Sequence, residues 1–453
     1  MHSMNTPVNT TAPFAGQFDA VSDQLPGLGL SWLDTRRQEA ITEYNGFGLP
    51  TNKLESWKFT RLPRIADNDF RPVGPQDGEI AVETVPSLFD ESAEGHRIVF
   101  VNGHHRPELS NIERLPKGVR LESLRATLER DPTFVEHYLS DLLGDKSAAL
   151  NALNSAFMDS GLVVHVERDV EVTEPIEVIR LNGKTDTPVI RHPRNVIVVE
   201  DGATLTLVKN HSGLDVGGYL TNAVTDVHVG DGATLRHYTV QAESLDALHL
   251  ANVNVNVGKD ATYEAFSLTI GGRLSRMETN VRLTGTGGHC NLSGAYLLRG
   301  REHCDNTTVI EHLTPDATSR EVFKGVLDDD SRGVFQGKIV VHKDAQRTDG
   351  HQLSKALLLS DRAEMDAKPE LEIYADDVKC SHGAATGQLD ETSLFYLRSR
   401  GIPEALARNL LIQSFMGEAL EEVSDLVVRE VMRDRILHWL PAQCYLSEEW
   451  RQE

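Results

Sequence analysis

The sequence is poor in cysteine and has no long apolar run. Four of its 453 residues are cysteine, and none lies in a CxxC pair, which argues against a disulfide framework and fits a reducing compartment. No apolar stretch approaches the roughly 18 residues of a membrane span. Residues 1–20 lack the basic start and apolar centre of an export signal, so we expect a cytoplasmic protein without a membrane segment.

Positive charge is also scarce. Lysine and arginine together number 45, against 68 acidic residues, which gives a net charge of −23 at pH 7. This excess of negative charge argues against sequence-independent binding to nucleic acid or to anionic lipid. The expected partners are therefore proteins or small ligands.

The signature motifs of several common enzyme classes are absent. No GxSxG elbow and no HExxH zinc motif occurs. The glycines of Gly333–Lys338 have the wrong spacing for a phosphate-binding loop, and no hydroxyl residue follows Lys338 to hold magnesium. We therefore expect that the chain does not hydrolyse ATP alone.

A short sequence motif is repeated in the middle of the chain. Asp201-Gly202 and its flanking residues return at Asp231-Gly232 and, more loosely, at Lys259-Asp260. Gly230, Gly258 and Gly285 keep nearly the same interval. A period of about 30 residues, carried by β-rich segments with turns between them, is typical of a solenoid whose units stack on one another.

The segments between the turns alternate apolar and polar residues. Residues 195–199, 224–229 and 251–257 are rich in valine, and period-2 alternation places these valines on one face of a strand. In a coiled β-helix that face points into the core, while Asp-Gly corners supply positive φ angles. An antiparallel sandwich with a hairpin at each Asp-Gly is the alternative.

Helix signals before and after the repeats divide the chain into three parts. Residues 1–30 should form a loose arm, after which Ser31 caps a helix closed by Asn45-Gly46, and Asp131 caps a later one. The predicted parts are an N-terminal mixed, mainly helical domain (1–161), a parallel β-helix core (162–389) and a C-terminal helical domain (390–453).

The C-terminal part is predicted to contain three helices. Asp390 caps the first, Pro403 begins the second and Ser424 caps the third. The second helix is apolar over a wide arc from Leu406 to Val423. Such a helix needs cover on two sides, either from the solenoid and its sister helices or from a partner protein.

A small set of soft metal ligands remains. Positions two apart on a strand share a face, whereas neighbours point to opposite faces. Cys380 and His382 can therefore aim at one metal or cluster, and a neighbouring His-Cys pair cannot; thiolate with imidazole suits iron, zinc or a cluster. A buried thiol beside a hydrogen-bonded histidine is the alternative. The remaining candidates are His289-Cys290, His303-Cys304, His342 and His351; Cys444 is the one further cysteine.

Three segments resemble a known family. They are Lys368–Asp390 with Leu394–Ile402 after it, Gly337–Gln352, and Glu55–Thr60. Together they resemble the SufB/SufD family of the Suf iron–sulfur assembly system. The B-type members would read His-Glu-Ala where this chain has His382-Gly383-Ala384, so the resemblance favours the D-type, SufD.

This resemblance implies a right-handed parallel β-helix between helical domains. It also implies a non-enzymatic scaffold in a complex with a SufB-like subunit and SufC-like ABC ATPases, with a homodimer left open. His382 would lie at the interface with the SufB-like chain, at a site for a nascent, transient iron–sulfur cluster, and Cys380 would be its companion. The C-terminal domain would dock the ATPase, and truncation after Leu389 should leave the β-helix folded.

A carbohydrate-active β-helix lyase or hydrolase is the alternative function, by analogy of fold alone. Such an enzyme needs carboxylate pairs or calcium-binding acids along one groove. Asp328-Asp329-Asp330 is the only acidic run of that kind, and a solvated turn explains it equally well.

Overall fold

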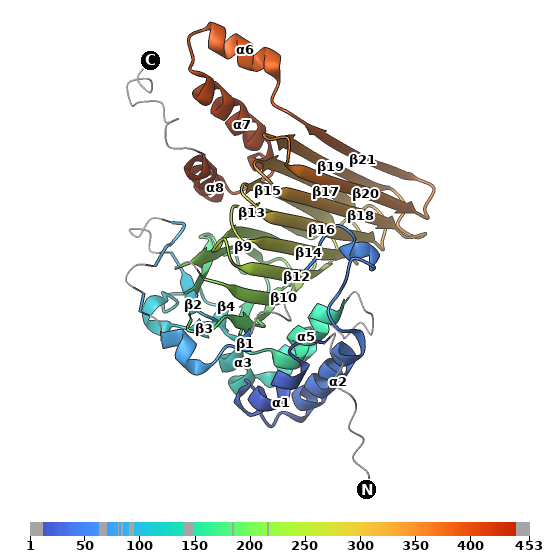
Figure 1. Ribbon diagram of the computed structural model, residues 1–453. Coiled ribbons are helices and arrows are strands. Elements are labelled where there is room, and N and C mark those ends of the chain that lie inside the picture. The colour runs from blue at the N-terminus through green and yellow to red at the C-terminus, as the bar shows by residue number, and fades with distance from the viewer. Residues whose placement is uncertain are drawn as a thin grey trace.

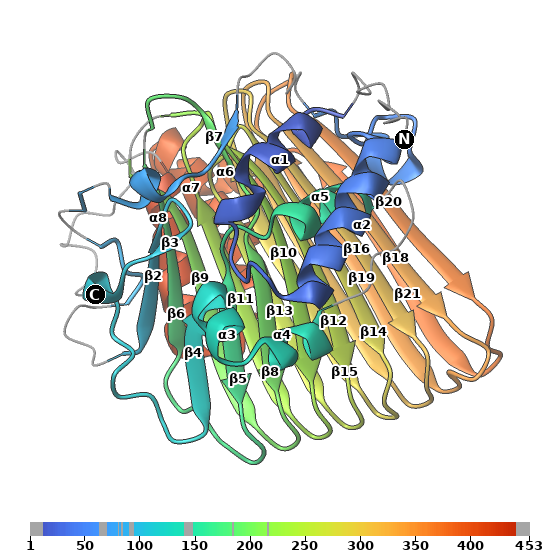
Figure 2. The same ribbon diagram turned by 90° about the horizontal axis from the view of Figure 1, so that it is seen from below.

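The computed structural model is a mainly β protein built on one long solenoid, with helices at both ends of the chain (Figures 1 and 2). It describes residues 12–62, 70–79, 81–82, 85–89, 95–139, 148–183, 185–214 and 217–440. Among these residues, no helix combines the length and apolarity that crossing a membrane requires.

Two sheets form the walls of the solenoid. In spatial order, the first sheet contains β4 (Val119–Ser123), β5 (Leu162–Val166), β8 (Arg194–Val199), β10 (Tyr219–Val229), β12 (Leu248–Val257), β14 (Leu274–Leu283), β16 (His303–His312), β18 (Arg332–Val341) and β20 (Glu364–Ile373), with β7 (Val189–Arg191) and β1 (Arg71–Pro72) at its side. The second contains β3 (His104–His105), β2 (Arg97–Val101), β6 (Ile176–Asn182), β9 (Thr204–Gly213), β11 (Thr234–Ala242), β13 (Thr262–Thr269), β15 (His289–Leu298), β17 (Thr318–Leu327), β19 (Thr348–Leu358) and β21 (Val378–Gly387).

The chain alternates between the sheets, so that each coil adds one strand to each wall. Apart from β4 and β3 at one end, neighbouring strands within a wall are parallel, as in β8 with β10 and β9 with β11. The two strands that flank Asp201-Gly202, β8 and β9, belong to different sheets. The predicted parallel β-helix is therefore confirmed, and the antiparallel sandwich is wrong because no hairpin forms at that corner.

The repeated motif marks one corner of successive coils. Gly202 and Gly232 have φ angles of 70° and 66°, and Asp260 takes the corresponding place with φ 51°. The carboxylate of each corner aspartate accepts a hydrogen bond from the next coil: Asp201 Oδ1 from the Asp231 amide at 2.8 Å, and Asp231 Oδ1 from the Lys259 amide at 2.8 Å. These hydrogen bonds between successive coils explain why the Asp-Gly motif recurs.

The evenly spaced glycines lie where one coil touches the next. A Cβ atom at Gly258 would lie 2.6 Å from Asp231 Oδ1, and one at Gly285 would lie 2.0 Å from the Lys259 backbone nitrogen. Any side chain at these positions would push the coils apart. The period of the glycines is therefore set by the spacing of the stack.

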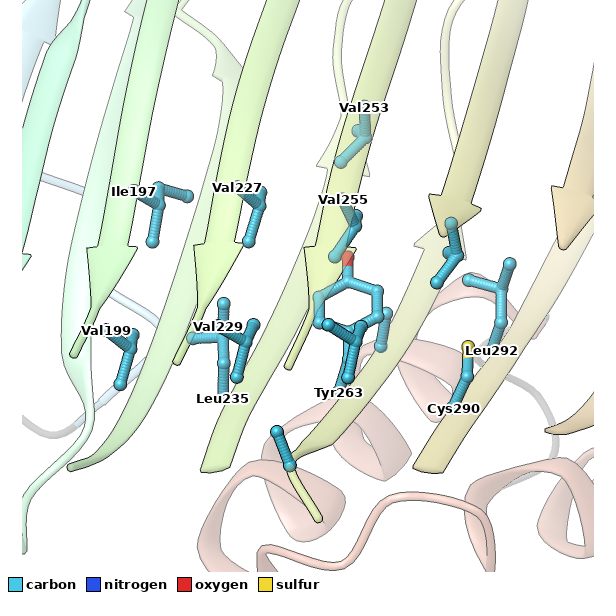
Figure 3. Close-up of a cluster of buried hydrophobic side chains, with 14 of the residues drawn as sticks. Ile197, Val199, Val227, Val229, Leu235, Val253, Val255, Tyr263, Cys290 and Leu292 are labelled. Carbon is cyan, nitrogen blue, oxygen red and sulfur yellow. The ribbon is translucent and has the colours of Figure 1, made fainter. Parts of the chain in front are cut away.

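Valines fill the space between the two walls (Figure 3). Val253, Val255 and Val257 are buried, whereas Asn254 and Asn256 between them are partly exposed. The alternation in residues 251–257 thus has the predicted orientation, because inward residues are shielded by both sheets.

Helices near the N-terminus cover the outer face of the first sheet, as Figure 2 shows for α2 and α5. The α-helices are α1 (Phe18–Val21), α2 (Ser31–Phe47), α3 (Leu124–Arg130), α4 (Pro132–Tyr138) and α5 (Ala149–Phe157). The 3-10 helices are η1 (Ala15–Gln17), η2 (Ser22–Gln24), η3 (Glu55–Trp57), η5 (Pro75–Glu79) and η6 (Pro107–Leu109). Leu220, Leu248 and Leu274 of the sheet pack against this layer.

Two details of the N-terminal prediction are wrong. Residues 12–30 do not form a loose arm, since Phe14 and Phe18 are buried against the helical layer; residues 1–11 lie outside the described chain. Ser31 begins α2 without capping it, and the helix continues to Phe47 before Gly48 (φ 66°). Asp131 does cap α4, with its side chain accepting from the Phe134 amide.

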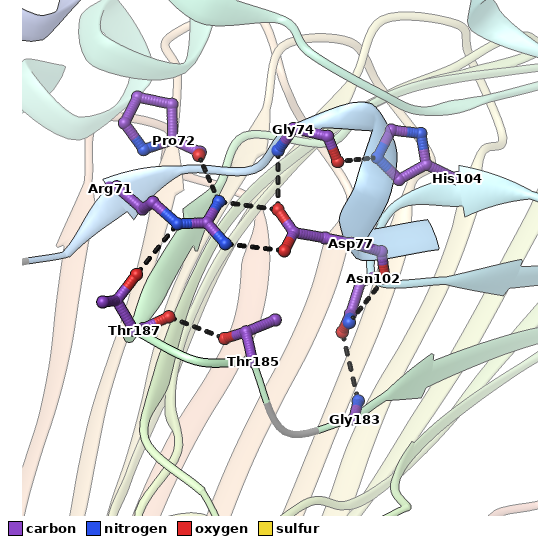
Figure 4. A network of polar contacts seen from close by, with 9 residues as sticks. All are labelled: Arg71, Pro72, Gly74, Asp77, Asn102, His104, Gly183, Thr185 and Thr187. Atoms are coloured by element: carbon purple, nitrogen blue, oxygen red, sulfur yellow. Dashed lines mark hydrogen bonds and ion pairs between the residues drawn. The ribbon is translucent and has the colours of Figure 1, made fainter. Parts of the chain in front are cut away.

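A half-buried ion pair orders the segment around β1 beside the start of the solenoid (Figure 4). Both terminal nitrogens of Arg71 donate to the Asp77 carboxylate at 2.7 Å. Asn102, at the turn between β2 and β3, donates to the Asp77 carbonyl and accepts from the Gly183 amide. These contacts join three separate stretches of chain where the stack begins.

Three helices near the C-terminus follow the solenoid: α6 (Glu391–Ser399), α7 (Glu404–Leu420) and α8 (Leu426–Trp439). Asp390 caps α6 as predicted. The cap of α8 is Asp425 rather than Ser424. Ser424 instead bonds the solenoid, because its amide donates to Glu264 and its hydroxyl accepts from Arg236.

Candidate functional site

The solenoid ends in an open pair of strands. Within the described part of the chain, the last strands, β20 and β21, each pair on one side only, with β18 and β19 respectively (Figure 1). At the other end of the stack, antiparallel strands β4 and β3 close the two sheets. An edge strand with free backbone N–H and C=O groups can accept another strand. The C-terminal end is therefore the place where a further coil could stack.

Cys380 lies on β21 and faces the interior of the solenoid. It is half-buried and packs against the apolar core, and a Cβ atom at its register partner Gly350 would lie 3.7 Å from its Sγ atom. Burial raises the pKa of the Cys380 thiol, and the charge of Asp349 adds to this effect. The thiol is therefore mostly protonated at neutral pH, and binding a metal would release its proton.

His382 is two residues further along β21 and is exposed. Strand alternation places it on the same face as Cys380. Its register partner on β19 is Gln352, whose own partner on β17 is Glu321. Gln352 and Glu321 are both buried, so this row of polar residues runs from inside the solenoid to His382 at its open end.

The buried acid in this row has an unusual environment. Burial raises the pKa of Glu321 to about 7, and the nearby polar groups of Thr308 and Gln352 offset this only in part. Neither carboxylate oxygen makes a hydrogen bond of ordinary geometry among the described residues, and the same is true of the Gln352 amide. The interior near the open end is thus polar and incompletely paired.

His351 is held by other groups on the opposite face of the same sheet. Its Nδ1 atom lies 2.6 Å from the Ser381 hydroxyl, and its Nε2 atom lies 2.7 Å from Asp349 Oδ1. Since both ring nitrogens have partners, His351 does not join Cys380 and His382. His342 lies beyond β18 at a corner of the coil.

The two neighbouring His-Cys pairs are each split across a strand, as alternation requires. Cys290 lies in the apolar core, where burial raises its pKa, while His289 is exposed and bonds Thr318. Burial raises the pKa of Cys304 to about 12, and His303 contacts Thr60 instead. Cys444 lies outside the described residues.

The N-terminal segment that carries the family resemblance packs beside the open end. Glu55 and Lys368, 313 positions apart, form an ion pair at 2.7 Å. Trp57 is buried with the Arg276 guanidinium 4.1 Å from its ring centre. The Ser56 carbonyl accepts from Gln336 of β18. Trp57 is therefore a packing anchor, because its ring packs against the first sheet.

The apolar arc of α7 is covered within the chain. Ile412, Met416 and Leu420 are buried against the second sheet and α8. On α6, by contrast, Phe395 and Tyr396 are 72% and 57% exposed. Truncation after Leu389 would uncover the apolar outer face of the second sheet, so we do not expect the shortened solenoid to remain soundly folded.

The acidic run Asp328–Asp330 is a corner of the coil. Asp329 has φ 52° and accepts from the Gly300 amide, while Asp330 pairs with Arg362. The carboxylates of Asp329 and Asp330 hold neighbouring coils together, which agrees with the alternative that this acidic run is a solvated turn. They give no support to a glycan-cleaving site.

Comparison with known proteins identifies the family. A model described as SUF system FeS cluster assembly, SufBD core domain, matches residues 180–415, and one for the SufBD protein N-terminal region matches residues 9–178. The two models together cover most of the solenoid and the helical layer on its first sheet. The chain belongs to the SufBD family of iron–sulfur cluster assembly proteins.

Within this family the chain is similar to SufD. It is 30% identical to the iron–sulfur cluster assembly protein SufD of Escherichia coli K12, over 89% of this chain and 92% of that protein. It is 27% identical to SufD of Bacillus subtilis, over 87% and 90%. A SufBD-family protein of Synechocystis is 31% identical over 90% and 91%. The resemblance stated from the sequence is therefore confirmed.

Proposed function

We propose that this chain is a non-catalytic scaffold subunit of an ATPase-driven complex that assembles iron–sulfur clusters. Its open end would pair with a SufB-like subunit, and its C-terminal helices would bind a SufC-like ABC ATPase. The single observation that carries the proposal is the unpaired edge of β20 and β21, with Cys380 and His382 on the last strand.

The chemistry of the last strand supports a role in holding a transient cluster, which is the cargo of the complex. Imidazole and thiolate both bind iron. His382 is exposed on the last strand, beside which a partner strand would add. A cysteine from the SufB-like subunit could complete the site there, with Cys380 as a second ligand from this chain.

The exposed aromatic pair on α6 supports a protein-binding surface at the C-terminal domain. Phe395 and Tyr396 are large, exposed and next to Arg398 and Arg400. Aromatic residues and arginine are enriched in the centres of protein interfaces. Since the apolar arc of α7 is already covered, we place ATPase docking on α6.

Co-purification tests this proposal directly. The full-length chain, tagged and isolated from native lysate, should retain both a SufB-like protein and a SufC-like ATPase in near-stoichiometric amounts. Recovery of the chain alone or as a homodimer, with cluster assembly intact in its absence, would contradict the proposed scaffold role.

A further inference from the structure

Two histidines and a glutamate meet inside the solenoid, away from the open end. His211 lies near the end of β9, Glu243 directly follows β11, and His249 lies near the start of β12. All three side chains are buried. Each side chain offers one potential ligand atom, a ring nitrogen or a carboxylate oxygen, and these three atoms lie within 4.8 Å of one another.

Neighbouring groups orient the glutamate at this point. Asn182 Nδ2 donates to Glu243 Oε1 at 2.6 Å, and Gln241 Nε2 donates to Oε2 at 3.1 Å. The rings of His211 and His249 stand edge to face, with centres 4.8 Å apart and planes at 81°. Outer donors that fix a ligand carboxylate are a regular feature of metal sites in proteins.

Two of the three side chains are already in direct contact. His249 Nδ1 and Glu243 Oε2 are 2.6 Å apart. The structure therefore already brings one carboxylate and two imidazole rings together.

We propose that His211, Glu243 and His249 form a binding site for one divalent first-row transition-metal ion, Fe²⁺ or Zn²⁺. Two imidazoles and one carboxylate are a ligand set that both ions use, with one or more positions left for water. The ion would lie between His249 Nδ1 and Glu243 Oε2, which now contact each other directly. Tetrahedral bonds of about 2.1 Å to the ion require ligand atoms about 3.4 Å apart. The distance between His249 Nδ1 and Glu243 Oε2, now 2.6 Å, would therefore increase by less than about 1 Å.

The site is separate from the cluster-binding end. Six strand-to-strand steps lie between β9 and β21 in the second sheet, which corresponds to about 29 Å at about 4.8 Å per step. Glu243 lies directly before a corner whose residue Leu245 is exposed, so access from solvent requires only movement of this short corner. The inference does not depend on the proposed scaffold function.

Metal titration of the full-length protein tests the site. To exclude the open end, every protein carries Cys380→Ser and His382→Ala, and is stripped with a chelator before titration with Fe²⁺ without oxygen or, separately, with Zn²⁺. We expect one ion per chain and an X-ray absorption spectrum with two imidazole ligands. Binding of only one of the two ions would support the site and identify its metal.

Matched variants separate this site from adventitious binding. Glu243→Gln should weaken binding at least about 100-fold, since a direct ligand matters at least as much as an outer-shell partner. Glu321→Gln, an equally buried glutamate elsewhere in the solenoid, should bind like the parent. If Glu243→Gln fails to fold, Asn182→Ala should weaken binding about tenfold. A parent protein without stoichiometric metal, or equal affinity in the folded Glu243→Gln or Asn182→Ala variant, would overturn the inference.

Discussion

Gln352 and His382 are register partners on the last two strands of the second sheet, yet only Gln352 is buried. The difference in burial arises because β19 has a neighbouring strand on both sides, whereas β21 has no further neighbour among the described strands. His382 therefore occupies a position that is interior in every earlier coil. A homologous chain stacking on this end would enclose it as β21 encloses Gln352.

Glu321 should make stability depend on pH. Its folded pKa is about 7 against an ordinary value of 4.5, so the folded state holds a proton that the unfolded state releases. Its contribution to stability therefore falls as pH rises from 4.5 through 7, by up to about 3 kcal/mol for a shift of about 2.5 units.

The substitution Glu321→Gln should remove this loss of stability at rising pH, because glutamine does not titrate. The free energy of unfolding of the variant, relative to the parent, should increase by roughly 2 to 3 kcal/mol between pH 5 and pH 8 in denaturant titrations. Glu421→Gln, at an exposed glutamate, is the control and should show no such trend. A pH-independent difference for Glu321→Gln would show that its carboxyl group titrates normally.

Gly285 should be intolerant of substitution. Because a Cβ atom there would lie 2.0 Å from the Lys259 nitrogen, Gly285→Ala should force the coils apart and lower the free energy of unfolding by about 2 to 3 kcal/mol. Gly417→Ala is the control. It lies in α7 with open space at its Cβ position and should stabilise by up to about 1 kcal/mol. Equal thermal midpoints for the two variants would contradict the packing argument.

The exposed face of α6 should bind the ATPase. Replacing Phe395 and Tyr396 with serine should abolish ATPase recovery in pull-downs and change stability by no more than about 0.5 kcal/mol, because both side chains are exposed. Leu426→Ser with Val427→Ser, at an exposed apolar pair on α8, is the control and should retain the ATPase. The reverse pattern would place docking on α8.

The β-helix could be predicted because its signal is local. The Asp-Gly corners and the valine alternation each follow from one coil's own sequence, and each coil repeats them. The same local chemistry identified Asp131 and Asp390 as caps. The prediction that Ser424 caps α8 was wrong, because which of Ser424 and Asp425 becomes the cap depends on contacts of Ser424 with Glu264 and Arg236 of the distant solenoid.

The sites depend on longer-range information. Alternation placed Cys380 and His382 on one face, but the exposure of His382 follows from the end of the stack, which no local pattern marks. His211, Glu243 and His249 form no recognisable motif, since their meeting depends on the register of β9 and on the corner between β11 and β12. Only the folded arrangement brings these three side chains together.

The central claim is that His382 at the open end supports cluster assembly rather than folding. The most direct measurement is the iron and acid-labile sulfide content of the reconstituted complex with SufB-like and SufC-like partners. His382→Ala should keep its thermal midpoint and its partners but lose cluster formation, because alanine offers no ligand, and Cys380→Ala should show a weaker defect. His351→Ala, whose ring faces the opposite side and is already bonded, should assemble clusters normally. Normal iron and sulfide content in the His382→Ala complex would contradict the account.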